Sequence, residues 1–247
     1  MPREWDAAEY DRLGSPMARW GETVVGWLEL RGNECVLDAG CGTGKVTERL
    51  MQRLPHGRVI ALDGSTAMVD RAKTRLAPYA DRVEYVVADL SRALPLHVRV
   101  DAILSTATFH WILDHDPLFE NLAAVLRPGG QLVAQCGGAG NIASIETALR
   151  ELGEDFEGRK HYATPEDTRR RLERAGFTEI ETWLHDEPTD LEPEDLEPYL
   201  ATICLGDHVE AMDDDARGAL FVREVAARMP GPRIDYVRLN IRARRAD

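Results

Sequence analysis

Three glycines at alternate positions follow an aspartate in the stretch Asp38–Gly44, which reads DAGCGTG. Glycines have no Cβ, so a ligand can approach the backbone closely where a strand turns into a helix. A dinucleotide-binding loop has the pattern G-x-G-x-x-G, and Lys45 stands where its third glycine would be. The P-loop spacing does not match either. The loop therefore predicts a ligand other than a dinucleotide or a triphosphate.

Carboxylates stand at defined intervals around this loop. Asp38 would repel a pyrophosphate and favour an ammonium or a sulfonium group. Asp63 ends the next expected strand, where a carboxylate can accept both ribose hydroxyls. Asp89 ends the third expected strand, beside Leu90, where it can bind an adenine amino group. The set predicts a nucleoside cofactor with an amino-acid part and no phosphate.

The remainder of the chain alternates between apolar strand patterns and amphipathic helix patterns. The strands expected first are 34–39, 58–63, 83–89, 100–107 and 131–136, and the helices are 45–54, 65–76 and 117–126. RPGG at Arg127–Gly130 is interpreted as a breaker. Further on, helices are expected at 141–152, 164–176, 194–205 and 214–229, and strands at 177–188 and 233–245. This order predicts an α/β fold with a doubly wound, mostly parallel seven-stranded sheet and an antiparallel last strand.

Charge and cysteine usage restrict the class of protein. The formal net charge of -13 over 247 residues disfavours nucleic acid as a partner. None of the four cysteines stands in a C-x-x-C pair or a zinc-like cluster, so no metal site is expected. No apolar run approaches the roughly 20 residues of a membrane span, and the N-terminus is charged. A cytoplasmic protein with no membrane partner is therefore expected.

The glycine loop, Asp63, Asp89 and Arg127–Gly130 together resemble the motifs of class I S-adenosylmethionine (SAM) methyltransferases, from about residue 30 to 137. FHWILD at 109–114 and WDAAEY at 5–10 resemble the trans-aconitate methyltransferase group. They are also similar to carboxyl methyltransferases of the juvenile-hormone-acid type. The resemblance implies a Rossmann-like sheet and SAM as cofactor. It also implies methyl transfer to a small molecule, at a carboxylate or hydroxyl oxygen.

The resemblance also implies an organisation and a set of site residues. A single domain, 1–247, is expected, with N-terminal lid helices at 1–30, a cofactor-binding half at 31–137, and C-terminal helices and closing strands at 138–247. The cofactor-binding residues it implies are Tyr10, Arg19, Asp38, Gly40, Cys41, Gly42, Asp63, Gly64, Met68, Ala88, Asp89, Leu90, Ser105, Thr106 and His110. Among them, Tyr10 and Arg19 would meet the methionine carboxylate. His110 and Trp111 would face the acceptor and position it.

One position departs from the juvenile-hormone-acid pattern. A glutamine that holds the substrate carboxylate in those enzymes is replaced here by Met17, which cannot donate a hydrogen bond. Met17 and the tryptophans would suit a largely apolar acceptor. Two other readings stay open: a SAM-binding protein without transferase activity, and a methyltransferase that acts on a protein or nucleic acid. The sequence does not determine the acceptor, the need for a general base or the oligomeric state.

Overall fold

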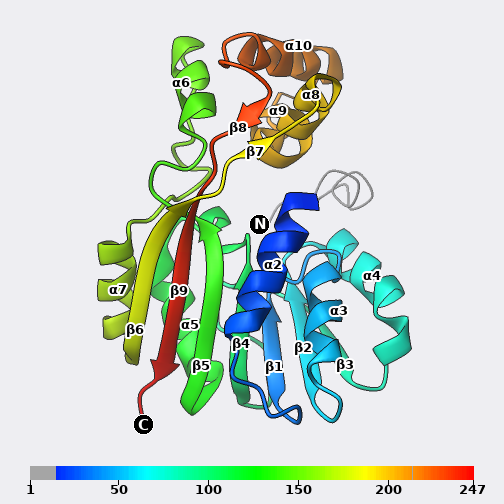
Figure 1. Ribbon diagram of the computed structural model, residues 1–247, viewed down its shortest axis with the longest axis vertical. Coiled ribbons are helices and arrows are strands. Elements are labelled where there is room, and N and C mark those ends of the chain that lie inside the picture. The colour runs from blue at the N-terminus through cyan, green and yellow to red at the C-terminus, as the bar shows by residue number, and fades with distance from the viewer. Residues whose placement is uncertain (1–14, 213) are drawn as a thin grey trace.

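The computed structural model describes residues 15–212 and 214–247, with side chains from residue 19 onward. A seven-stranded sheet in the order β3-β2-β1-β4-β5-β9-β6 forms its centre (Figure 1). The strands are β1 (Cys35–Ala39), β2 (Arg58–Asp63), β3 (Val83–Val87), β4 (Val100–Thr106), β5 (Leu126–Gly137), β6 (Phe177–Asp186) and β9 (Val237–Arg245). The first five are parallel, and β9 runs antiparallel to both β5 and β6. The fold class expected from the sequence is confirmed.

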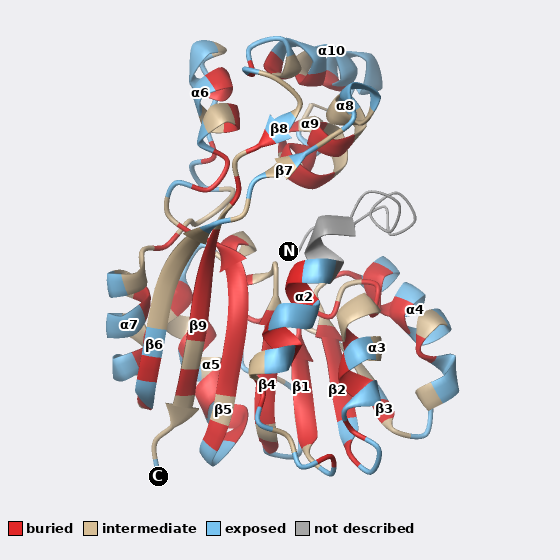
Figure 2. Cartoon of the chain, viewed as in Figure 1, coloured by how far each residue is buried: buried red, intermediate tan, exposed pale blue. Residues whose placement is uncertain are grey.

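Helices cover both faces of the sheet, as the doubly wound arrangement requires. One face packs against α2 (Ser15–Trp27), α3 (Lys45–Gln52) and α4 (Thr66–Arg75). The other packs against α5 (His115–Val125) and α7 (Pro165–Arg174). Successive residues of a strand point to opposite faces, so Leu37 of β1 enters one core and Val36 the other. Both are fully buried, and Figure 2 shows the central strands buried along most of their length.

Local capping explains where two of these helices begin. The side chain of Ser65 accepts a hydrogen bond from the backbone N–H of Met68 at 3.2 Å at the start of α4. The side chain of Thr164 accepts one from the N–H of Asp167 at 3.1 Å, with Pro165 in the first turn of α7. Each bond satisfies a backbone donor that the helix itself cannot. Both helix starts agree with the expectation from the sequence.

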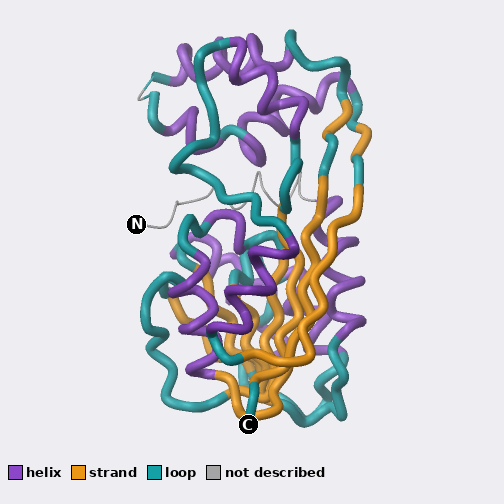
Figure 3. The backbone as a smooth tube through the Cα atoms, turned by 90° about the vertical axis from the view of Figure 1, so that its left-hand side faces the viewer, coloured by secondary structure: helices purple, strands orange, loops and turns teal. Residues whose placement is uncertain are grey.

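Residues 142–152, 189–212 and 214–234 form a separate layer, here called the helical cap, above the carboxyl ends of the parallel strands (Figures 1 and 3). Its described elements are α6 (Ala143–Glu151), β7 (Thr189–Asp190), η3 (Pro193–Asp195), α8 (Leu196–Tyr199), η4 (Leu200–Cys204), α9 (Gly206–Glu210), α10 (Asp215–Ala226) and β8 (Arg233–Ile234). The cap has its own apolar cluster, in which the hydroxyls of Tyr199 and Tyr236 share a hydrogen bond of 2.6 Å. The cap therefore covers the edge of the sheet at which open α/β sheets bind their ligands.

Three details of the expected elements were wrong. Arg127–Gly130 does not break the chain but lies inside β5, as an irregularity where the pairing with β4 changes register. The strand expected at 233–245 is divided into β8 and β9, because its first part pairs with β7 in the cap. The helix expected at 194–205 changes from 3-10 to α to π geometry along its length. The first two departures depend on strand partners distant in sequence, which local patterning does not show. Among the described residues, no helix has the length and apolar composition needed to cross a membrane.

Candidate cofactor and acceptor site

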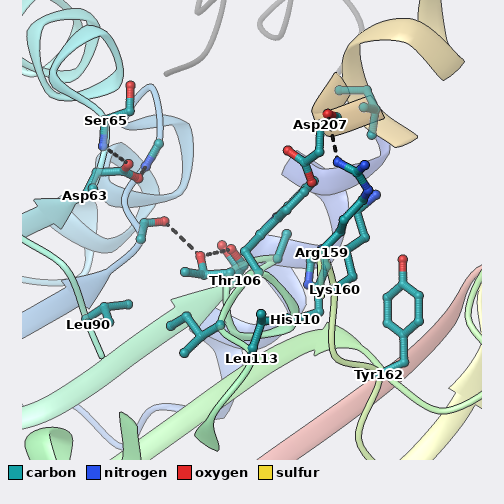
Figure 4. A pocket seen from close by; sticks show the side chains of 18 of the residues that line it. Asp63, Ser65, Leu90, Thr106, His110, Leu113, Arg159, Lys160, Tyr162 and Asp207 are labelled. Atoms are coloured by element: carbon teal, nitrogen blue, oxygen red, sulfur yellow. Dashed lines mark hydrogen bonds between the residues drawn. The ribbon is translucent and has the colours of Figure 1, made fainter. Parts of the chain in front are cut away.

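A cavity of about 730 Å³ lies between the carboxyl ends of the parallel strands and the helical cap. This volume falls within the roughly 300–1,000 Å³ of small-molecule sites. Of the residues expected from the sequence, those that line it are Gly40, Gly42, Asp63, Gly64, Met68, Ala88, Asp89, Leu90, Thr106, His110 and Trp111. Figure 4 shows Asp63 and Ser65 on one wall and Arg159, Lys160 and Asp207 on the facing wall. The fold thus brings most of the predicted set to one place.

The three loop glycines have different structural roles. All three have positive φ, 88° at Gly40, 52° at Gly42 and 82° at Gly44. A Cβ on Gly40 would lie 2.0 Å from the hydroxyl of Thr108, and one on Gly44 would meet Ala72 at 3.2 Å. A Cβ on Gly42 would meet nothing within 4 Å, and Gly42 lines the cavity. Gly42 is therefore the glycine whose missing side chain leaves room for a ligand, while the other two permit close packing.

Backbone hydrogen bonds hold two carboxylates at the cavity wall. Asp63 accepts one from the N–H of Gly42 and one from the N–H of Ser65, each at 2.9 Å. Asp89 accepts from the N–H of Ser91 at 2.9 Å and from its hydroxyl at 2.6 Å. Both side chains line the cavity, where a carboxylate oxygen can accept a hydrogen bond from a ligand. These fixed acceptors fit the hydroxyls of a ribose and the amino group of an adenine.

Asp38 lies outside the cavity. It is fully buried beneath the loop, where the hydroxyl of Thr47 donates to its Oδ2 at 2.6 Å. Burial raises the pKa of Asp38 to about 7, against the lowering effect of the Thr47 bond, and the nearby Asp63 charge raises it further. Its Oδ1 has no partner in the described part of the chain. Asp38 therefore joins β1 to the first turn of α3, and its predicted role beside a cationic group stays a prediction.

Three other predicted residues that the structure describes, Ser105, Cys41 and Arg19, do not line the cavity. Ser105 is buried and donates its hydroxyl to a backbone carbonyl of β1 at 2.6 Å. Burial raises the pKa of Cys41 well above its usual value, so its thiol stays protonated. Arg19 is exposed and pairs with Glu187 at 3.1 Å. Tyr10 lies outside the described residues, as does the side chain of Met17. Their contacts with cofactor or acceptor stay predictions.

His110 follows β4, in the short helix η2 (Phe109–Trp111). The backbone N–H of Gly137 donates to its Nδ1 at 3.3 Å, which assigns the ring proton to Nε2. Burial, with the nearby charges of Arg238 and Lys160 and the neighbouring His115, lowers the pKa of His110 well below its usual value. The imidazole is therefore neutral at pH 7. Its Nε2–H is a hydrogen-bond donor, and the ring cannot act as a general base through Nδ1.

The wall facing the glycine loop contains residues that the sequence did not single out. Arg238 of β9 is 2 % exposed, and its guanidinium carbon lies 4.4 Å from the ring centre of Trp20. The Lys160 ammonium lies 4.6 Å from the ring centre of Trp111. Tyr162 also lines this wall. Arg238 is the second residue of β9, and the sequence pattern of the strand expected at 233–245 does not distinguish a buried arginine from an exposed one.

This arrangement is a Rossmann-like fold whose cavity, beneath the cap, has the size and polar groups suited to a nucleoside cofactor. Residues 36–130 match a family described as "Methyltransferase domain". The chain is 32% identical over 189 residues to the malonyl-[acyl-carrier protein] O-methyltransferase of Geobacter sulfurreducens, covering 73% of this chain and 70% of that protein. It is 32% identical over 169 residues to the trans-aconitate 2-methyltransferase of Acidovorax ebreus, covering 68% of this chain but 63%, less than two thirds, of that relative. The chain belongs to the class I SAM-dependent methyltransferases, the family its motifs resemble.

A solved structure agrees with this fold. The magnesium protoporphyrin IX methyltransferase of Synechocystis PCC 6803, with S-adenosylhomocysteine bound, has a TM-score of 0.61 at 18% identity. The match covers 96% of this chain and 86% of that one. SAM is the cofactor, and the Gly42 opening with Asp63 and Asp89 fits its nucleoside part. No group of three or more His, Cys, Asp or Glu side chains that could hold a metal ion occurs within 15–212 and 214–247.

Proposed function

We propose that this protein transfers a methyl group from SAM to an oxygen atom of a small-molecule acceptor, a carboxylate in preference to a hydroxyl. The observation that carries the proposal is a single cavity. It extends from Asp63 and Asp89 to a compartment under the helical cap, lined by Trp20, Ile142 and Ile203 among others. A roofed compartment of this size suits a small molecule better than a protein surface or a nucleic-acid strand. The names of the two relatives support the same class of reaction, because one is a methyltransferase of trans-aconitate, an organic acid, and the other is an O-methyltransferase.

The chemistry requires positioning more than acid–base catalysis. Bound SAM supplies an electrophilic methyl group whose sulfur leaves without needing a proton. The side chains must hold the acceptor oxygen in line with that group, within about 3–3.5 Å of it. The Nε2–H of His110 donates toward the cavity and orients the acceptor oxygen. Trp111 and Ile203 exclude water from the reacting atoms.

The protonation states of three lining side chains favour a carboxylate as acceptor. A hydroxyl acceptor needs a general base, whereas a carboxylate is already ionised at pH 7. His110 keeps its proton on Nε2 and has a pKa well below its usual value. Burial raises the pKa of Tyr162 and Tyr236, so both phenols keep their protons. None of these three groups accepts a proton readily at pH 7.

The test is methyl transfer from labelled SAM to trans-aconitate and to a panel of other acids, phenols and amines. Calorimetry with S-adenosylhomocysteine is run in parallel. We expect binding of the cofactor product and label in an ester. Cofactor binding with no transfer to any member of the panel would favour a SAM-binding protein instead. Label recovered in protein or nucleic acid from a cell extract would favour a macromolecular substrate. Absence of cofactor binding would contradict the proposal altogether.

A further inference from the structure

The helical cap and β9 enclose a positive charge that the proposed reaction does not explain. Arg238 lines the cavity and is 2 % exposed. Its Nε has no hydrogen-bond partner, and no described carboxylate forms an ion pair with its guanidinium. An unpaired buried charge is costly, so buried charges in proteins are normally paired. The arrangement is that of a receptor for an anion.

The ionisable groups that most affect the pKa of Arg238 are Cys136 and Tyr236, and both are neutral at pH 7. Burial raises the pKa of the Cys136 thiol to about 12 and that of Tyr236 well above its usual value. The face of Trp20 lies 4.4 Å from the guanidinium carbon, and that of Tyr236 lies 5.9 Å from it. Such stacking fixes the plane of the guanidinium without neutralising its charge. Two planar N–H groups held in this way match the geometry of a carboxylate.

We propose that Arg238 holds the carboxylate of the acceptor, an organic acid whose apolar body packs against Trp20, Tyr236 and Ile203. This inference deepens the proposed function and rests on it. The bound carboxylate replaces the missing counter-ion, and the aromatic and aliphatic wall selects for a hydrophobic body. The acceptor is therefore amphipathic, in contrast to the largely apolar compound expected from the sequence. Lys160, on the same wall, adds positive potential.

The position of Arg238 in the sheet assigns this anion to the acceptor, not to the amino-acid end of SAM. The glycine loop follows β1, and the order β1-β4-β5-β9 puts Arg238 three strands away. At about 4.8 Å per strand, that is roughly 14 Å across the sheet. Arg238 pairs with Gly137 at the end of β5, and Tyr236, two residues earlier, belongs to the apolar cluster of the cap. Arg238 therefore lies between the end of β5 and the helical cap, beneath the acceptor compartment.

The experiment compares wild type with Arg238→Met and with Arg242→Met. Arg242 is the matched control, because it lies on the same strand but on the surface, paired with Glu181 at 3.1 Å. The probes are phenylacetate, indole-3-acetate and octanoate, each beside its uncharged amide, in the presence of S-adenosylhomocysteine. Binding is measured by calorimetry and by the shift in Tm. We expect at least one acid to bind wild type and Arg242→Met, and to bind Arg238→Met about ten- to a hundredfold more weakly.

Other results would overturn the inference. It fails if none of the three acids binds wild type, if an acid binds Arg238→Met equally well, or if the amide binds as tightly as its acid. Without ligand, Arg238→Met should unfold at the wild-type temperature or above it, because an unpaired buried charge is removed. Should that variant not fold, Arg238→Lys replaces it. Lysine keeps the charge but not the planar pair of donors, so a smaller loss of affinity is expected.

Two cofactor measurements separate this inference from the proposed function. Arg238→Met should bind both S-adenosylhomocysteine and 5′-methylthioadenosine, which has no amino-acid part, as wild type does. Loss of the first with retention of the second would show that Arg238 binds the cofactor's own carboxylate, and the inference would be wrong. Failure of wild type to bind S-adenosylhomocysteine would instead contradict the proposed function. Failure of all three acids to bind wild type, while the cofactor product binds, contradicts the inference alone.

Discussion

Substitution of Gly42 by alanine separates the space that a ligand needs from the space that the fold needs. Gly42 has a φ of 52°, inside the left-handed region that non-glycine residues adopt at a cost of roughly 1–2 kcal/mol. The added methyl group meets nothing within 4 Å in the protein. For a chain of this length, about 1 kcal/mol lowers the Tm by roughly 2–4 °C. We therefore expect Gly42→Ala to fold, with a Tm about 2–8 °C below wild type.

Cofactor affinity should change much more in relative terms. The methyl group projects into the cavity, and forcing it against a bound ligand costs about 1–3 kcal/mol by analogy with overpacked cores. That corresponds to a Kd for S-adenosylhomocysteine about 5- to 150-fold higher. Calorimetry on the folded variant measures it. An unchanged Kd would refute the assignment of Gly42 as the ligand-facing glycine.

Two matched variants control for strain and for packing. Gly129 has a φ of 71° and equally open surroundings, but it lies on β5 away from the cavity. Gly129→Ala should lower the Tm by a similar amount and leave the Kd unchanged. Gly40→Ala places its Cβ 2.0 Å from the Thr108 hydroxyl oxygen, at a φ of 88°, so it combines backbone strain with a steric clash. It should lower the Tm by more than either.

Three further predictions follow from the same structure. Asp63→Ala should weaken binding of S-adenosylhomocysteine by at least about 100-fold, because it removes the carboxylate that accepts the hydrogen bond from the glycine loop. The control Asp70→Ala, at an exposed position, should bind as wild type does. Equal affinities of the two variants in calorimetry would contradict this prediction. Burial lowers the pKa of His115 from 6.5 to about 4, so the unfolded chain binds more protons between these values. The free energy of unfolding should then fall by up to about 3 kcal/mol as the pH drops from 6.5 to 4. Urea titrations over this pH range measure the change. If the free energy of unfolding depends on pH as steeply in His115→Leu as in wild type, His115 is not the group responsible. Tyr199→Phe should lower the free energy of unfolding by about 1–3 kcal/mol, because it removes the hydroxyl that lies 2.6 Å from the buried hydroxyl of Tyr236. Urea unfolding measures this change. A wild-type free energy would show that the Tyr236 hydroxyl finds another partner.

The local pattern of apolar and polar residues predicts most strands of the sheet and most of the helices that cover it. The expected strand at 58–63 coincides with β2, because its apolar run is bounded by turn residues on both sides. The starts of α4 and α7 followed from the capping side chains Ser65 and Thr164, whose bonds span three residues. The cap was not foreseen as a separate layer. The division of β8 from β9 depends on pairing with β7, more than forty residues earlier.

In the site, as in the fold, local sequence predicts some residues, while the places of others depend on contacts between distant segments. Asp63 and Asp89 could be predicted because Asp63 ends β2 and Asp89 comes two residues after β3, and parallel strands bring their ends to one edge. Arg238 could not, because its place opposite Gly137 joins segments about a hundred residues apart. The expected proximity of Asp38 to the ligand depended on side-chain direction. The Thr47 hydroxyl draws that carboxylate beneath the loop, and nothing in the spacing of the motif indicates it.

The position of β9 between β5 and β6 has a consequence for how the chain folds. β6 forms its hydrogen bonds in the large sheet with β9, which is synthesised about fifty residues later. Until then neither edge of β6 is paired in the large sheet, and its free backbone groups can recruit another chain. Insertion of β9 closes contacts of long sequence separation, which slow folding steps typically require. We expect the parallel half of the sheet to gain protection from amide exchange before β6, and aggregation to start from β6 when β9 is weakened.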